Sequence, residues 1–241
     1  MSSDDLRDAR AKLAWANREI EFLAHDLAAF FERKPYAIVG ERQPDGRKHL
    51  IFNVTEEVPG IIQASVGSVL YAQRSSLDIL ANCLANRNGH QDSRDTYFPI
   101  AKTATAVATD KDFRKKIRKL ADSDKAKIIG LKPYQGGNDR LYALHHLNLM
   151  DKHRRLLEIS GTINQFGLSG FGHVREIRTH FGPEPMKNGA HILTVDTDDQ
   201  INLNFTLNVS FSDSGGLPSK PIVEMLNDFT SVCDAIINMF A

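Results

Sequence analysis

The chain of 241 residues is 41% hydrophobic and 25% charged, and its 30 lysine and arginine residues balance 30 aspartate and glutamate residues. A net charge of zero excludes a global field that would recruit nucleic acid or an acidic membrane. No stretch is long and apolar enough to cross a bilayer, and the first residues lack the apolar core of a signal peptide. We therefore expect a soluble, cytoplasmic protein with no membrane partner.

Short motifs with a known chemistry are absent from the sequence. It contains no P-loop, dinucleotide fingerprint, HExxH, G-x-S-x-G or paired CxxC. Cys83 and Cys233 fall within apolar helical patterns, which favours buried free thiols over a disulfide. The sequence therefore predicts no cofactor, and candidate functional residues must be sought where ionisable side chains gather.

The first element in chain order is a long amphipathic helix that starts at residues 2–5 and continues to about Glu32. Its apolar residues recur at heptad-like spacing, and Ala9, Ala16 and Ala24 lie on or near the same face. This spacing is compatible with a coiled coil between chains, but the small residues favour close packing inside one bundle. We expect the bundle.

A β-hairpin is predicted next, because two strand-like runs flank a set of turn residues. Pro35 ends the helix, the runs cover residues 36–39 and 49–54, and Pro44-Asp45-Gly46 lies between them. The hairpin is then followed by a second long helix over residues 61–85.

The second helix carries a polar ladder, since Tyr71, Arg74, Asp78 and Asn82 share one of its faces. One interpretation is a solvated face with a weak ion pair between Arg74 and Asp78. The other is an inward polar stripe that meets ionisable residues of a later helix, because a charge buried between helices must be paired.

The segment after this helix alternates between polar and apolar character. A polar loop is expected over residues 87–96 and an apolar anchor over 97–100, whereas residues 101–109 are small and show no pattern. Residues 110–120 predict a basic helix. Such a run is usually a solvated face, and the alternative is a phosphate-contacting patch formed by Lys111, Arg114, Lys115 and Arg118.

Apolar and ionisable residues are most densely mixed in residues 131–158. A short helix over 123–129 precedes the breaker run 132–137, and a helix is then predicted from Asn138 to Ile159. Near its end five ionisable residues follow one another, too many for all to face solvent: Asp151, Lys152, His153, Arg154 and Arg155.

We therefore expect a polar cluster between this helix and the second helix. In that cluster Arg74 pairs with Asp151 or Asp78. If the cluster is structural, Asp151→Ala leaves a buried charge unpaired and costs about 3 to 5 kcal/mol.

Beyond Ile159 the apolar period changes from about 3.6 residues to 2. Residues 168–180, 190–195 and 201–211 predict three antiparallel strands, and the last of them has one polar face that is wet or covered by a partner. A final helix opens after the breakers at 215–218.

These elements predict an α+β fold. A helical bundle made of a long N-terminal helix, central helices and a C-terminal helix carries an N-terminal β-hairpin and a C-terminal antiparallel sheet. No linker or repeat divides the chain, which favours one domain over residues 1–241. The alternative division is a helical part with the hairpin, 1–160, and strands with the last helix, 161–241.

Several short motifs occur together in the chain. They are LYAQRSSLD at residues 70–78, Phe-Pro-Ile at 98–100, Pro-Tyr at 133–134, and a helix at 144–154 that ends in Asp-Lys-His-Arg. This set resembles a family of uncharacterised bacterial proteins over about the first two thirds of the chain. Members often carry a histidine directly after Leu-Asp, where this chain has Ile79. The resemblance implies that one site or one structural network contains Arg74, Asp78, Asp151, Lys152, His153 and Arg154.

The first functional hypothesis is a binding or interaction protein whose polar cluster fixes how the helices pack. Its partner, a second copy or another protein, would use the N-terminal helix or the strand at 201–211. Nucleic acid is a less favoured partner, because the chain has no net charge.

The second hypothesis is a metal-independent ribonuclease of the HEPN kind, in which a helical bundle presents an Arg and a His with four to six residues between them. Arg140 and His145 have this spacing, and so do Arg175 and His180 within a predicted strand, which shows how readily the pattern arises. The basic helix would then guide the substrate.

A metal hydrolase is the third hypothesis, with ligands drawn from His145, His146, Asp151 and His153. His146 and His153 lie about 10 Å apart along a helix axis, which is too far for one ion without other elements. Adjacent His145 and His146 point about 100° apart. No metal site is therefore predicted.

Overall fold

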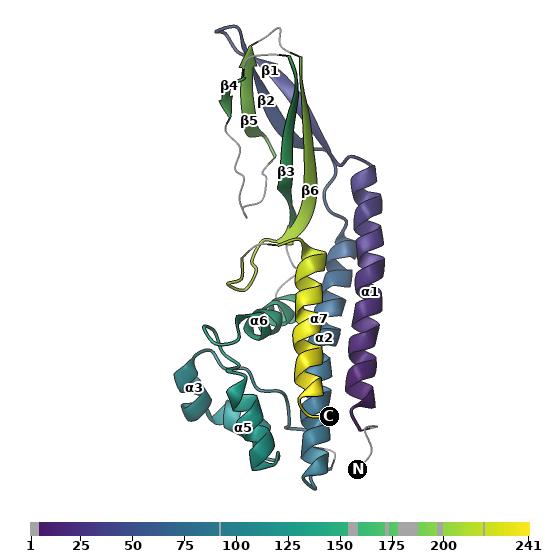
Figure 1. The fold of residues 1–241 in the computed structure, drawn as a ribbon, viewed down its shortest axis with the longest axis vertical. Helices are drawn as coiled ribbons and strands as arrows, with labels where there is room; N and C mark the ends of the chain where they lie inside the picture. Colours follow the sequence, from purple (N-terminus) through teal and green to yellow (C-terminus); the bar gives the residue numbers. More distant parts are fainter. Residues whose placement is uncertain are drawn as a thin grey trace.

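Three long helices form one end of the molecule and two antiparallel sheets form the other (Figure 1). The computed structural model describes residues 5–91, 93–153, 159–171, 174–177, 188–196, 200–218 and 220–241. Within these ranges only the backbone is described for residues 152–153, 159–171, 174–177 and 200–207. The predicted α+β fold is confirmed.

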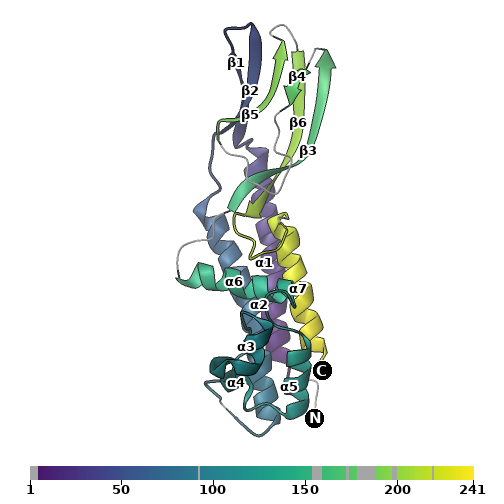
Figure 2. The ribbon, with the colours of Figure 1, turned by 90° about the vertical axis from the view of Figure 1, so that its left-hand side faces the viewer.

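The bundle consists of α1 (Arg7–Glu32), α2 (Gly60–Arg87) and α7 (Ile222–Asn238), which run side by side (Figures 1 and 2). The apolar face of α1 packs on α2 and α7 of its own chain, so the bundle interpretation of its heptad-like spacing is confirmed. Close approach is possible because Ala9 and Ala16 on that face are fully buried.

One arginine fastens the end of the bundle where the helices meet. The guanidinium of Arg87, in the last turn of α2, pairs with the carboxylate of Asp5 just before α1. It also donates a 2.6 Å hydrogen bond to the carbonyl of Phe240, just after α7. These contacts set the alignment of α1 and α7 against α2.

The predicted hairpin is confirmed as β1 (Tyr36–Arg42) and β2 (Arg47–Val54). It belongs to a four-stranded sheet with the order β1-β2-β5-β4, in which β5 spans Ala190–Asp196 and β4 spans Val174–Ile177. A second sheet pairs β3 (Ile159–Phe171) with β6 (Gln200–Phe211).

Two predicted boundaries between helix and strand are wrong. The strand predicted over 168–180 is instead part of β3, which begins already at Ile159, and the separate strand β4. For the same reason the helix predicted to reach Ile159 is shorter: α6 spans Asp139–His153. The cause is pairing at long range, because Ile159 lies opposite Phe211 and the length of β6 sets that of β3.

Three short helices flank the bundle: α3 (Ala104–Thr109), α4 (Lys111–Ile117) and α5 (Asp122–Gly130). The helix α3 was not expected from its small, featureless sequence. It forms because the hydroxyl of Thr103 accepts a hydrogen bond from the backbone N–H of Ala106 and caps the first turn. The next two helices match the predicted ones.

Strand β5 pairs with β2, so a division of the chain at residue 160 would separate two neighbouring strands of one sheet. Whether the chain is one domain stays a prediction. The polar face predicted for the strand at 201–211 lies largely on side chains outside the described residues. Among the described helices, none is long and apolar enough to cross a membrane.

Candidate functional site

A buried cation lies on the inner face of α2. The Arg74 side chain is 7% exposed, and one of its terminal nitrogens donates a 2.7 Å hydrogen bond to the Asp78 carboxylate one turn later. Its other terminal nitrogen donates a 2.6 Å bond to the carbonyl of Phe98. The predicted pairing of Arg74 with Asp78 is confirmed, and it lies in the interior and not on a solvated face.

The polar ladder of α2 holds the extended segment 96–101 against the bundle. Asp78 accepts a 2.9 Å hydrogen bond from the N–H of Phe98, and the amide of Asn82 donates a 3.2 Å bond to the carbonyl of Thr96. Phe98 itself is fully buried, as expected for an apolar anchor. Arg74, Asp78 and Asn82 therefore turn inward, whereas Tyr71 is 45% exposed. Backbone groups supply these polar contacts, where the second interpretation expected ionisable residues near the end of a later helix.

Asp151 contacts α2 at a point nearer the N-terminal end of that helix than Arg74 is. A Cβ atom added at Gly67 would collide with the carboxylate of Asp151, so this carboxylate covers Gly67. Gly67 precedes Arg74 by two helical turns, about 10 Å along the axis. The alternative pairing of Arg74 with Asp151 is replaced by the local pair with Asp78. The side chains of Lys152 and His153, and the whole of Arg154, lie outside the described residues.

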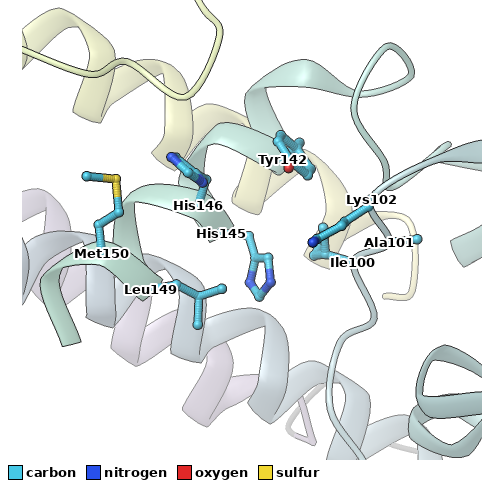
Figure 3. A pocket seen from close by; sticks show the side chains of 8 residues that line it. All are labelled: Ile100, Ala101, Lys102, Tyr142, His145, His146, Leu149 and Met150. Atoms are coloured by element: carbon cyan, nitrogen blue, oxygen red, sulfur yellow. The ribbon is translucent and has the colours of Figure 1, made fainter. Parts of the chain in front are cut away.

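A pocket of about 520 Å³ opens between α6 and the end of the extended segment (Figure 3). Its polar lining comes from Lys102, Tyr142, His145 and His146, and its apolar lining from Ile100, Leu149 and Met150. Tyr142, His145, His146, Leu149 and Met150 come from one helix, so their spacing of three and four residues places them along one side of it.

His145 connects the pocket to the buried cation. The Nε of Arg74 lies 3.4 Å from Nδ1 of His145, a long hydrogen bond. Because a guanidinium only donates, Nδ1 must accept and the proton of the neutral ring lies on Nε2. Arg74 therefore selects the tautomer of a ring that lines the pocket.

The second imidazole, His146, has a carboxylate partner. Its Nε2 lies 3.4 Å from Oδ2 of Asp213, and its ring stacks on that of Tyr142 with 6.3 Å between ring centres. The pKa of Asp213 is lowered, first by a hydrogen bond from the N–H of Gly215 and then by His146. Because the ionised carboxylate only accepts, Nε2 carries the proton and Nδ1 is the acceptor nitrogen of the neutral ring.

Arg140 and His145, the pair proposed for a ribonuclease, contact two different helices. Arg140 points to α7, where its Nε lies 3.9 Å from Asp228, whereas His145 contacts Arg74 on α2. The two residues are about 140° apart around the helix, which accounts for the divergence. Arg175 and His180 lie outside the described side chains.

The basic helix α4 presents most of its charges to solvent. Lys111, Arg114 and Lys115 are exposed. Arg118 and Lys119, just beyond it, both pair with Asp95 of the polar loop, at 2.5 and 2.7 Å. The solvated-face interpretation fits this helix, and the two basic residues that follow it are neutralised by Asp95.

Histidines do not gather into a metal site in the described part of the chain. No group of three or more His, Cys, Asp or Glu residues there could hold a metal ion. Cys83 and Cys233 are free thiols, and burial raises the pKa of the Cys233 thiol to about 12.

Comparisons with family models, curated proteins and solved structures yield no match to this chain. The resemblance to a bacterial family therefore stays a prediction.

Sequence reasoning missed Lys102 and Tyr142. Tyr142 precedes His145 and His146 by one helical turn, and that spacing could have placed it beside them. No local pattern marks Lys102, which reaches the pocket only because the segment before it is anchored on α2.

Asp78→Ala is expected to lower the free energy of unfolding by about 2 to 4 kcal/mol, because the guanidinium of Arg74 stays buried without its carboxylate. Urea unfolding measures this loss. Asp78→Asn keeps an acceptor oxygen and should lose less. Asp151→Ala should also lower the free energy of unfolding by less, because Asp151 lies far from Arg74. This replaces the larger loss that was expected from the sequence. Equal losses for Asp78→Ala and Asp151→Ala would contradict the assignment.

The pKa of Asp95 is lowered from 3.8 to about 2, chiefly by the hydrogen bond from Lys119, with Arg118 adding positive charge. A carboxyl group with a lowered pKa stabilises the fold above its ordinary pKa, and the contribution is lost as pH falls toward the lowered value. Urea midpoints of the wild type should therefore fall more steeply between about pH 4 and pH 2 than those of Asp95→Asn. Parallel curves would contradict this.

Proposed function

We propose that the protein binds a small anionic molecule with an apolar part, in the pocket between α6 and residues 100–102. The observation that carries the proposal is a pocket lining that combines a cation with apolar side chains. Lys102 supplies a positive charge, and Leu149 and Met150 supply an apolar surface. Pockets of this kind orient a ligand through a few polar groups and bind it through apolar contact.

The polar cluster behind the pocket has a structural role in this proposal. Arg74 is occupied by Asp78 and by the carbonyl of Phe98, so its charge is neutralised inside the bundle. It contributes to binding indirectly, through the hydrogen bond that orients His145. The exposed Lys102 is thus the cation through which the pocket contacts an anion.

Phenyl phosphate, inorganic phosphate and phenol separate the two halves of the proposed ligand. We expect calorimetric affinities in the order phenyl phosphate, phosphate, phenol, since only the first can contact both Lys102 and the apolar lining. Lys102→Ala should weaken phenyl phosphate binding about tenfold, the loss of one charge-assisted hydrogen bond.

Lys111→Ala is the matched control, because Lys111 is also an exposed lysine and lies on α4. Its affinity for phenyl phosphate should equal that of the wild type. Absence of binding by all three probes, or equal effects of the two lysine substitutions, would refute the proposal.

A metal-independent ribonuclease is the second candidate, favoured by the contact of Arg74 with His145 and by the opposite proton positions of the two imidazoles. The 2′-oxygen would bond to phosphorus as its proton passes to Nδ1 of His146. The bond to the 5′-oxygen would break as that oxygen takes the Nε2 proton of His145, which leaves an imidazolate beside the Arg74 guanidinium until the proton on His146 returns to it through water. The products are a 2′,3′-cyclic phosphate and a 5′-hydroxyl.

Incubation of mixed RNA with the protein in a metal chelator tests this candidate. If it is correct, the wild type cleaves RNA to cyclic phosphate ends, and His145→Ala and His146→Ala each lower the rate by about 10²-fold or more. Lys115→Ala is the control with wild-type rate. Absence of cleavage, or cleavage by both histidine variants at the wild-type rate, would exclude the ribonuclease while leaving ligand binding to be judged separately.

A further inference from the structure

We propose that the protein forms a symmetric dimer in which the outer sides of two α1 helices pack antiparallel. The surface concerned, called here the α1 stripe, consists of five residues at alternating spacings of three and four, which places them along one side of the helix. They are Lys12, Trp15, Glu19, Phe22 and Asp26.

The α1 stripe exposes two large aromatic side chains one above the other. Trp15 is 36% exposed and Phe22 is 58% exposed, although the opposite side of α1 is packed in the core. Figure 1 shows α1 at the edge of the bundle, with α2 and α7 on one side of it. Exposed aromatic residues that share a surface mark interaction sites more often than single exposed residues do.

The order of residues in the stripe suits a twofold axis between Arg18 and Glu19. Trp15 and Phe22 each lie about 5 Å from that point along the helix, on opposite sides of it. An antiparallel second copy therefore places its Phe22 against Trp15, and its Trp15 against Phe22. This reciprocity is what a closed symmetric dimer requires of one surface.

The charges follow the same symmetry. Lys12 and Asp26 lie about 10 and 11 Å from the axis on opposite sides, so each meets the other type in the second copy. At the axis itself, Arg18 and Glu19 pair with each other within one chain, at 3.2 Å. Within the part of the chain that the structure describes, no hydrogen bond or ion pair is found for Asp26. This charge complementarity identifies a second copy of the chain as the occupant.

Lys12 is already held in place for this contact. Its ammonium lies 5.4 Å from the ring centres of both Trp15 and Tyr71, so the side chain bridges α1 and α2. Two aromatic residues and a few charges per copy make a small interface. We expect a dimer with a dissociation constant of about micromolar order.

Sedimentation velocity over a range of concentrations measures the dimer directly. The wild type should shift from monomer to dimer near micromolar concentrations, and the Trp15→Ser/Phe22→Ser variant should stay monomeric. Circular dichroism should show the same helix content for both, because the two side chains are outside the core. A wild type that remains monomeric up to the highest concentration reached would overturn the proposal.

Charge reversal tests the antiparallel arrangement. Lys12→Glu and Asp26→Lys should each weaken the dimer about tenfold, since each turns two attractive pairs repulsive. The double variant Lys12→Glu/Asp26→Lys restores both pairs and should dimerise like the wild type. Lys115→Glu on α4 is the control with unchanged association. A double variant no better than the single ones would overturn the proposed arrangement.

Discussion

The burial of one guanidinium group is the constraint on which this structure depends. A charge inside a bundle costs several kcal/mol unless its hydrogen bonds are satisfied. Arg74 satisfies them with the carboxylate of Asp78, the carbonyl of Phe98 and a nitrogen of His145. These three partners belong to α2, to an extended segment and to α6, so a single side chain joins three parts of the fold.

The pocket follows from that junction. The contacts to Phe98 hold the extended segment on α2, and the same segment continues through Ile100 and Ala101 to Lys102 at the pocket. On the facing side His145 is oriented from behind by Arg74. The buried groups fix the positions of the pocket residues, whereas the side chains open to a ligand lie nearer the surface. This separates the residues that maintain the fold from those that would recognise a molecule.

The long elements were predictable because their apolar periods are local properties of the chain. Both long helices of the N-terminal half, the hairpin and the last helix were therefore placed correctly. The boundary at Ile159 was not, since its strand state comes from pairing with Phe211. The main partner of Arg74 outside its own helix could not be predicted either. It is the carbonyl of Phe98, and a backbone carbonyl cannot be recognised from the residue type.

The packing of α1 against α7 has a consequence for synthesis of the chain. Residues 7–32 leave the ribosome long before residues 222–238, yet the two helices share one core. The apolar side of α1 can pair early with α2, but α7 completes its cover only late in translation. In the same way, strand β2 cannot pair with β5 until residues 190–196 have been synthesised. Nascent chains of this protein thus expose apolar surface for much of their elongation, the condition under which chaperones engage a growing polypeptide.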